Sequence, residues 1–171
     1  MSGMTTTAHH PFKEPGLAPV IGRDPAILIL GSYPSCQSLE KCEYYGNPQN
    51  QFWKIVEMLL GIDHTLLYTT RCSRLVEHRV ALWDVLATCT RDGSADTAIR
   101  NPVPNDIGGL LAAHPTIRSI ALNGNTAGRY SARMNPGIPC TILPSTSPAY
   151  ARMTLDEKAQ RWACILTPHI R

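Results

Sequence analysis

The sequence predicts an α/β fold, a three-layer sandwich in which a central, mainly parallel four-stranded sheet is flanked by helices. The chain has 171 residues, a length that suits one domain. Short apolar runs alternate along it with segments of helical period, as in strands that run parallel within one sheet. One run, 26–30, is apolar throughout, which is typical of a strand buried on both faces.

The chain before this strand has a different composition. Residues 1–25 are rich in Thr, Pro, Gly and His and show no apolar period. We therefore expect a flexible N-terminal tail and lead-in, with His9 and His10 solvated, followed by a single folded domain over 26–171. We expect no signal peptide, because no basic start is followed by an apolar core.

The remaining elements follow from apolar periods and from the turns that bound them. A long loop is expected over 32–51, and loops of that length in compact domains are commonly functional. The last helix ends near Leu166 and opens with a capping box, Thr154 to Glu157. Between these, we expect four helices, over 52–60, 64–76 and 105–113 and from the turn Asn123–Gly124 to the residue before Asn135. Gly61 would end the first of them and Asn105 would cap the third. Strands are expected over 80–86, 117–122 and 141–143.

Composition excludes several classes of protein. With 16 Lys and Arg against 13 Asp and Glu, the net charge of +3 permits contact with nucleic acid without arguing for it. The apolar run 26–30 is too short to cross a membrane. The six cysteines are scattered and form no C-x-x-C pair, so we expect reduced, mostly buried thiols, no structural metal and no cofactor.

Two loops concentrate the chemistry, and both follow the carboxyl ends of strands. In a parallel sheet such ends lie at one edge, so the loops should line one crevice. The first begins with the small residues Gly31 and Ser32, and continues with aromatic rings for stacking and the carboxamide of Asn50. The second carries the hydroxyls of 145–147 between two prolines, and such groups suit phosphate oxygens.

These loops resemble the uracil-DNA glycosylase superfamily, and within it the hypoxanthine-DNA glycosylase (DNA-deoxyinosine glycosylase) branch. The resemblance runs from about Ile27 to the last helix. The motifs that carry it are Gly31-Ser32, Ser38-Leu39, the segment Tyr44 to Trp53, Pro104 to Ile107 and Pro144 to Ala149.

The mismatch-specific uracil glycosylases are more distant relatives with the same spacing. Aligned on it, their catalytic Asn falls on Tyr33 and their stacking Phe on Tyr45, so the water-activating Asn or Asp of the first motif is missing, as in the hypoxanthine branch. This chain departs from the branch at two pocket positions, with Asn47 where His is usual and Tyr150 where Asn is expected.

The resemblance implies a monofunctional DNA glycosylase that flips out and excises a deaminated base, hypoxanthine above others, in base excision repair. It implies DNA, double- or single-stranded, as the partner, no membrane, and a monomer in the cytoplasm of a bacterial-type cell. Asn50 would be catalytic. The groups that bind the base would be Gly31, Ser32, Tyr33, Ser38, Tyr44 and Tyr45, and those that bind DNA would be Ser145, Thr146, Ser147, Tyr150 and Arg152.

Simpler interpretations stay open for several of these residues. Asn50 precedes a helix and can serve as its cap, and the serines of the second loop can be turn formers. Phe52 and Trp53 are predicted to be core residues. Neither loop offers a catalytic lysine, since Lys41 is expected in solvent. Excision of uracil or xanthine, and a DNA-lesion-binding module without catalysis, are the alternatives to hypoxanthine excision.

Overall fold

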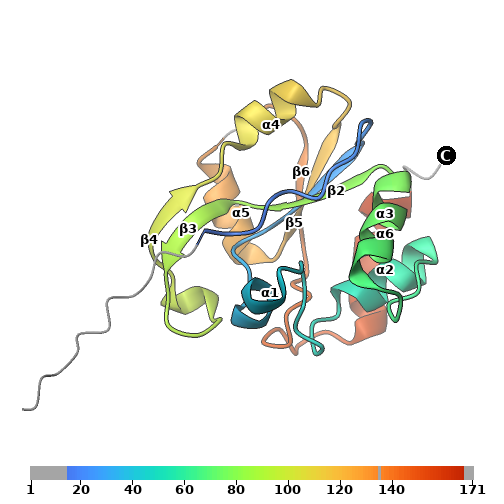
Figure 1. Ribbon diagram of the computed structural model, residues 1–171, viewed down its shortest axis with the longest axis horizontal. Coiled ribbons are helices and arrows are strands. Elements are labelled where there is room, and N and C mark those ends of the chain that lie inside the picture. Colours follow the sequence, from blue (N-terminus) through green and yellow to red (C-terminus); the bar gives the residue numbers. More distant parts are fainter. Residues whose placement is uncertain (1–14, 135, 168–171) are drawn as a thin grey trace, which may run out of the picture.

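The computed structural model describes residues 15–134 and 136–167, and its centre is a four-stranded parallel sheet. Its strands are β1 (Ile27–Gly31), β2 (Val80–Asp84), β5 (Ser119–Asn123) and β6 (Cys140–Leu143), in the spatial order β2-β1-β5-β6 (Figure 1). All three pairings are parallel, so the carboxyl ends of the strands meet at one edge. The predicted α/β class and four-stranded sheet are confirmed.

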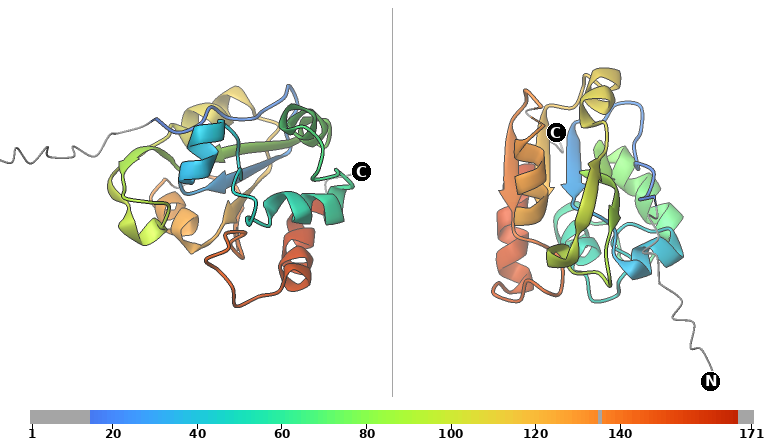
Figure 2. Two further views of the ribbon diagram at one scale, coloured as in Figure 1. Left: turned by 60° about the horizontal axis from the view of Figure 1, so that its bottom comes forward. Right: turned by 90° about the vertical axis from the view of Figure 1, so that its left-hand side faces the viewer.

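Helices cover both faces of this sheet (Figures 1 and 2). Ile27 and Ile29 of β1 pack in the cluster formed with α2 (Phe52–Leu60), α3 (Tyr68–Glu77) and α6 (Leu155–Leu166). Leu28 and Leu30 point the other way, into the cluster with α4 (Ile107–Ala113) and α5 (Asn125–Ala132). Alternate residues of a strand face opposite sides, which is why an entirely apolar run fits this central position.

A two-stranded antiparallel sheet adds to the α4–α5 side. It consists of β3 (Leu86–Thr90) and β4 (Arg100–Pro104), with the short 3-10 helix η1 (Asp96–Ala98) between them. The strand predicted over 80–86 is confirmed as β2 over Val80–Asp84, but its predicted end is wrong, because Leu86 already belongs to β3. The chain leaves the main sheet at Val85, whose N–H donates to the carbonyl of Gly31 at 2.9 Å.

Three other boundaries differ from the prediction. The loop expected over 32–51 contains α1 (Cys36–Lys41), because the Ser35 hydroxyl caps it by accepting the Ser38 N–H. Helix α4 is capped by Asp106, which accepts the N–H of Gly109 at 2.9 Å, and not by Asn105. Helix α3 begins at Tyr68, four residues later than expected. By contrast, Gly61 ends α2 and the capping box opens α6, as predicted.

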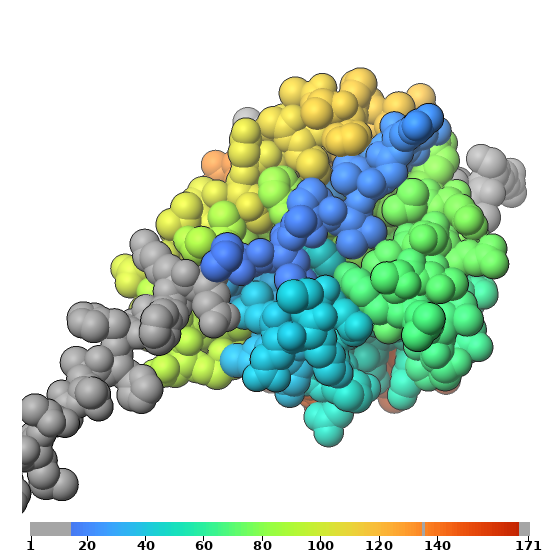
Figure 3. Space-filling model, in the orientation of Figure 1, coloured from blue at the N-terminus to red at the C-terminus, as the bar shows by residue number. Residues whose placement is uncertain are grey.

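The chain before β1 packs on the domain from residue 15 onward. Gly16 donates to the carbonyl of Ala87 at 2.8 Å, and Val20 exchanges two hydrogen bonds with Leu82. Figure 3 shows this lead-in in dark blue, running across one face of the molecule between α4 and α3. His9 and His10 lie outside the described residues.

The six cysteines are free thiols, but the expectation that most are buried is wrong. Cys89 is buried and Cys72 is half-buried, whereas the other four are exposed: Cys36, Cys42, Cys140 and Cys164. Over residues 15–134 and 136–167, no helix combines the length and the apolar character needed to span a membrane.

Candidate active site

A cavity of about 400 Å³ opens at the carboxyl ends of the parallel strands. Both functional loops line it. The first contributes Gly31 to Ser35, Ser38, Tyr44, Tyr45, Asn47 and Asn50, and the second contributes Ser145 to Ser147, Ala149 and Tyr150. This confirms that the two loops share one crevice. Two further segments complete the wall, Ser94 to Thr97 before and within η1, and Asn123 to Thr126 after β5.

Ser38 organises the first loop from within. Its side chain is 2 % exposed, and its hydroxyl accepts hydrogen bonds from the Ser35 hydroxyl and from the N–H of Gly46 at 2.9 Å. Lys41 donates to the carbonyl of Gly46, also at 2.9 Å, from an exposed position. Ser38 therefore lines the cavity with its own hydroxyl already engaged.

The two tyrosines of the first loop point to different places. Tyr44 is 3 % exposed, and its hydroxyl lies 3.1 Å and 3.0 Å from the carbonyl oxygens of Leu17 and Ala18, so it ties the loop to the lead-in. Its carbonyl accepts the indole N–H of Trp53, which is buried, as is Phe52, confirming that both are core residues.

Tyr45 lies in the left-handed region, at φ 56°, which is uncommon for a bulky side chain and costs on the order of 1–3 kcal/mol. Its ring stacks on Phe52 with centroids 4.0 Å apart. Its hydroxyl faces Asn123 but has no hydrogen bond of acceptable geometry among the described residues. Burial raises the pKa of Tyr45, and the Asp84 carboxyl raises it further, so the phenol stays neutral.

Asn50 lines the cavity at the start of α2. Its Oδ1 accepts the N–H of Phe52, the first residue of α2, at 2.9 Å. This bond fixes the orientation of the carboxamide of a residue that lines the cavity. The N-cap position is Gln51, which makes no side-chain cap, so the prediction of Asn50 as the cap is wrong by one residue. The next residue, Gln51, donates its N–H to the carbonyl of Thr146 at 2.9 Å and joins the two loops directly.

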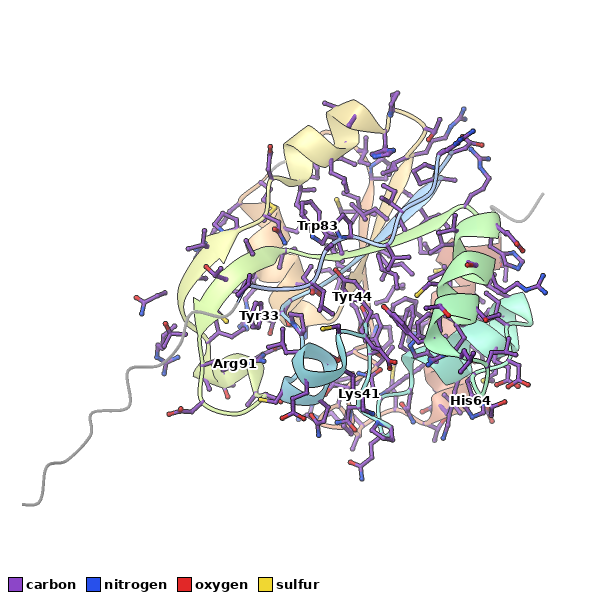
Figure 4. The ribbon with its side chains drawn as sticks, in the orientation of Figure 1. Tyr33, Lys41, Tyr44, His64, Trp83 and Arg91 are labelled. Atoms are coloured by element: carbon purple, nitrogen blue, oxygen red, sulfur yellow. The ribbon has the colours of Figure 1, made fainter. Side chains whose placement is uncertain are left out.

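Tyr33 and its neighbours contact the segment between β3 and β4, which the sequence did not place at the site. The guanidinium of Arg91 lies 5.0 Å from the centre of the Tyr33 ring and donates to the carbonyl of Pro34 (Figure 4). The Ser32 hydroxyl donates to Asp96 at 2.8 Å, and Cys36 donates its N–H to Ser94 at 3.0 Å. The segment between β3 and β4 thus closes one side of the cavity.

The second loop is fastened through Asn123 at the end of β5. The Asn123 carboxamide donates to the Thr146 hydroxyl and accepts the Thr146 N–H, both at 3.0 Å. Thr146 is fully buried, so its side chain supports the loop from behind. Ser145 and Ser147 are half-buried and line the cavity, and each hydroxyl accepts an N–H two residues later, as turn formers do.

Tyr150 lines the cavity and is supported from below by a buried lysine. The ammonium of Lys158 donates to the Tyr150 carbonyl at 2.8 Å and lies 5.3 Å from the centre of its ring. Burial lowers the pKa of Lys158. Arg152 is exposed and lies outside the cavity lining.

Asp84, at the end of β2, is a cavity residue that the sequence interpretation missed. It is 5 % exposed, and burial raises its pKa to about 7, helped by Asp96 and opposed by Arg91. A single carboxylate inside the apolar run 80–86 was the available signal, because buried carboxyl groups are uncommon outside functional sites.

Within residues 15–134 and 136–167, one group of possible metal ligands lies away from the cavity. Glu57, Asp63 and His64 cluster on the surface beside α2, where His64 contacts Glu57 (Figure 4 labels His64). None of the three lines the cavity.

Comparison with known proteins identifies the family. Residues 18–166 match the family model for the uracil DNA glycosylase superfamily. A protein from Methanosarcina acetivorans named hypoxanthine DNA glycosylase is 36% identical over 152 residues, covering 88% of this chain and 96% of the relative. A protein of the same name from Methanosarcina barkeri is 34% identical over 154 residues, covering 89% and 97%.

A solved structure agrees with these relatives. The solution NMR structure of a Methanosarcina acetivorans protein assigned to the uracil DNA glycosylases superposes with a TM-score of 0.83 at 33% identity. The match covers 94% of this chain and 100% of that one. This chain therefore belongs to the uracil DNA glycosylase superfamily.

Proposed function

We propose that this protein is a monofunctional DNA glycosylase that excises hypoxanthine from deoxyinosine. The observation that carries the proposal is the cavity of about 400 Å³ in which both family loops meet, with Asn50 in its wall. That volume is within the usual range of small-ligand sites. The two relatives at 34–36% identity are both named hypoxanthine DNA glycosylases.

A base inside a duplex must be flipped out to reach this cavity, at a cost of a few kcal/mol. Tyr45 would stack on the flipped base with the ring face that is turned away from Phe52. Main-chain groups of 31–33 would contact the edge of the base. Ser145 and Ser147 would contact phosphates at the mouth, with Tyr150 and Arg152 beside the strand. Ser38, Tyr44 and Thr146 would act as positioning residues.

Asn50 would act on the sugar. Hydrolysis breaks the bond between C1′ and the base, and positive charge develops on the sugar ring before water adds. A carboxamide held by the Phe52 N–H is preorganised to orient that water or to stabilise the charge without reorganising. No lysine is found among the described residues of the cavity wall, so water would be the nucleophile and no lyase step would follow.

The test is single-turnover release of free base from a duplex with one deoxyinosine. We expect Asn50→Ala to slow release about 10²-fold or more, the usual effect of removing such a group. Gln49→Ala is the matched control, because Gln49 is an exposed carboxamide in the same segment outside the cavity wall. Wild-type rates in a folded Asn50→Ala protein would refute the assignment.

Uracil or xanthine is the second candidate substrate, and the residue at position 47 is the observation in its favour. Asn47 lines the cavity where the branch usually has His, which changes the hydrogen bonds offered to a base. Oligonucleotides that carry inosine, uracil or xanthine, each as duplex and as single strand, distinguish these substrates. Tight binding with no base released from any of them would favour a lesion-binding module without catalysis.

We further propose that the protein acts as a monomer in the cytoplasm. The cavity wall described above is drawn from one chain and includes both loops, which supports a site that needs no second copy. Light scattering of the protein with and without duplex DNA measures the oligomeric state, and a dimer in both conditions would contradict it.

A further inference from the structure

Asp84 is a buried carboxyl group with an unusual lack of partners. It stands at the carboxyl end of β2, paired in register with Gly31 of β1, and it lines the cavity. Its Oδ2 is sealed from solvent and has no hydrogen-bond partner among the described residues. Its main-chain carbonyl, by contrast, accepts the side-chain amide of Asn105 at 2.8 Å. Buried polar atoms are nearly always paired, so an unpaired one calls for an explanation.

The neighbouring backbone leaves space for this carboxyl. A Cβ added to Gly31 would lie 2.6 Å from Oδ1 of Asp84 and 3.4 Å from the Tyr45 hydroxyl. Both polar groups therefore lie over the same face of Gly31, which itself lines the cavity. The Tyr45 hydroxyl is also buried without a hydrogen bond of acceptable geometry. Two polar groups without partners at one point of a cavity suit the polar atoms of a ligand.

Burial, more than the charges around it, favours the protonated form of Asp84 below about pH 7. Burial raises the pKa of this carboxyl to about 7, and the Asp96 carboxylate beside Ser32 contributes in the same direction. Arg91 opposes them, but its guanidinium is directed to the Tyr33 ring and the Pro34 carbonyl and forms no ion pair with Asp84. The other facing groups are the neutral phenols of Tyr44 and Tyr45.

The place of Asp84 decides which part of a nucleotide it meets. The hydroxyls of Ser145 and Ser147, which would contact phosphates, belong to half-buried residues of a loop, whereas Asp84 is 5 % exposed at the carboxyl end of the edge strand β2. A flipped nucleotide enters such a pocket with its base, so the base is the part that Asp84 would meet. A purine leaving group departs with an electron pair on N9, and protonation of one of its other ring acceptors makes that departure easier.

We propose that Asp84 is the proton donor to the leaving purine, an inference that rests on the proposed function. The carboxyl proton moves to an acceptor atom of the base as the C1′–N9 bond breaks, and its electron pair stays with N9. The hydroxyl of water forms the new bond to C1′. The remaining proton of that water returns Asp84 to its acid form through solvent, so one water is consumed and a neutral base is released.

The experiment is the pH dependence of single-turnover hypoxanthine release. In the wild type, the rate should be flat at low pH and fall about tenfold per pH unit above about pH 7, since the acid form is the active one. Asp84→Asn should lower the plateau rate about 10²-fold and remove the pH dependence. It should bind the deoxyinosine duplex within about threefold of wild type. Asp92→Asn, an exposed carboxylate in the following turn, is the matched control.

A second variant tests the same claim without touching Asp84. Asp96→Asn removes a negative charge that raises the pKa of Asp84, so the midpoint of the rate profile should move to lower pH. This shift and the wild-type profile remain decisive if Asp84→Asn does not fold.

Each contrary outcome has a distinct meaning. A wild-type rate in Asp84→Asn, an unchanged midpoint in Asp96→Asn, or a parallel loss of DNA binding and rate would overturn the proton-donor role. Absence of base release by the wild type at every pH would overturn the proposed function itself.

Discussion

Replacing Asp84 by Asn should make the protein more stable at high pH. A carboxyl whose pKa is raised in the folded state holds its proton there while the unfolded chain has lost it. Between the unfolded pKa, near 3.8, and the folded pKa of about 7, stability therefore falls as pH rises. The asparagine carboxamide has nearly the same shape and carries no proton to lose.

The size of the effect follows from this difference in pKa. The shift from 3.8 to about 7 corresponds to about 4 kcal/mol of destabilisation once the pH is well above 7. Only part of this destabilisation is present at pH 5. The free energy of unfolding of Asp84→Asn, relative to that of wild type, should therefore grow by about 2–3 kcal/mol between pH 5 and pH 8. For a domain of this size that is about 4–12 °C in the difference between their Tm values.

Urea unfolding of both proteins at the two pH values measures this directly, because groups common to both cancel in the comparison. Asp92→Asn serves again as the surface control and should show the same difference from wild type at both pH values. If the advantage of Asp84→Asn is equal at pH 5 and pH 8, the carboxyl is not held protonated by burial. A buried acid kept at the expense of stability is expected where function requires it.

Four other changes test separate parts of the structure. Gly31→Ala places a Cβ 2.6 Å from Asp84 Oδ1 and should cost about 1–3 kcal/mol in urea unfolding, whereas wild-type stability would show that the two strands are not so close. Asn123→Ala leaves the buried N–H and hydroxyl of Thr146 unpaired, so we expect a similar loss of about 1–3 kcal/mol together with weaker DNA binding. Arg152→Ala should reduce the slope of log K against log salt by about 1 in a DNA-binding titration, and an unchanged slope would remove Arg152 from the interface. Thr154→Ala breaks the capping box of α6 and should cost about 1 kcal/mol in a thermal melt, with the rate of base release unchanged.

Elements with a strong local signal were predictable from the sequence. The run 26–30 is apolar on both faces because it lies between the two helical layers, and this places β1 at the centre. Helix α2 has its apolar stripe and Gly61 as its end, and α6 has its capping box. In each case the residues that decide the structure are neighbours in the sequence.

Features that depend on distant partners were not predictable in this way. Strand β4 carries two prolines and is exposed along its length, so it pairs with β3 without any apolar alternation. The wall made by Arg91 and Asp96 depends on contacts with residues 57 to 64 positions away in sequence. Asp84 lies in a run that the sequence predicts to be an ordinary strand, and only the register with Gly31 places it at the cavity.

The candidate site likewise combines residues that short motifs predict with contacts that only tertiary packing sets. The second-loop serines and Asn50 were found from short motifs, and the structure places all of them at the cavity. The same motifs could not tell that Thr146 is buried behind Asn123 or that Tyr44 reaches back to the lead-in at Leu17, since burial is set by tertiary packing.

The most direct test of this account is chromatographic detection of free base after the purified protein meets a duplex with a single deoxyinosine. We expect release of hypoxanthine in one turnover, leaving an abasic site in an otherwise intact strand. A protein that binds this duplex and releases no base from it, or from the uracil and xanthine duplexes tested beside it, would contradict the account.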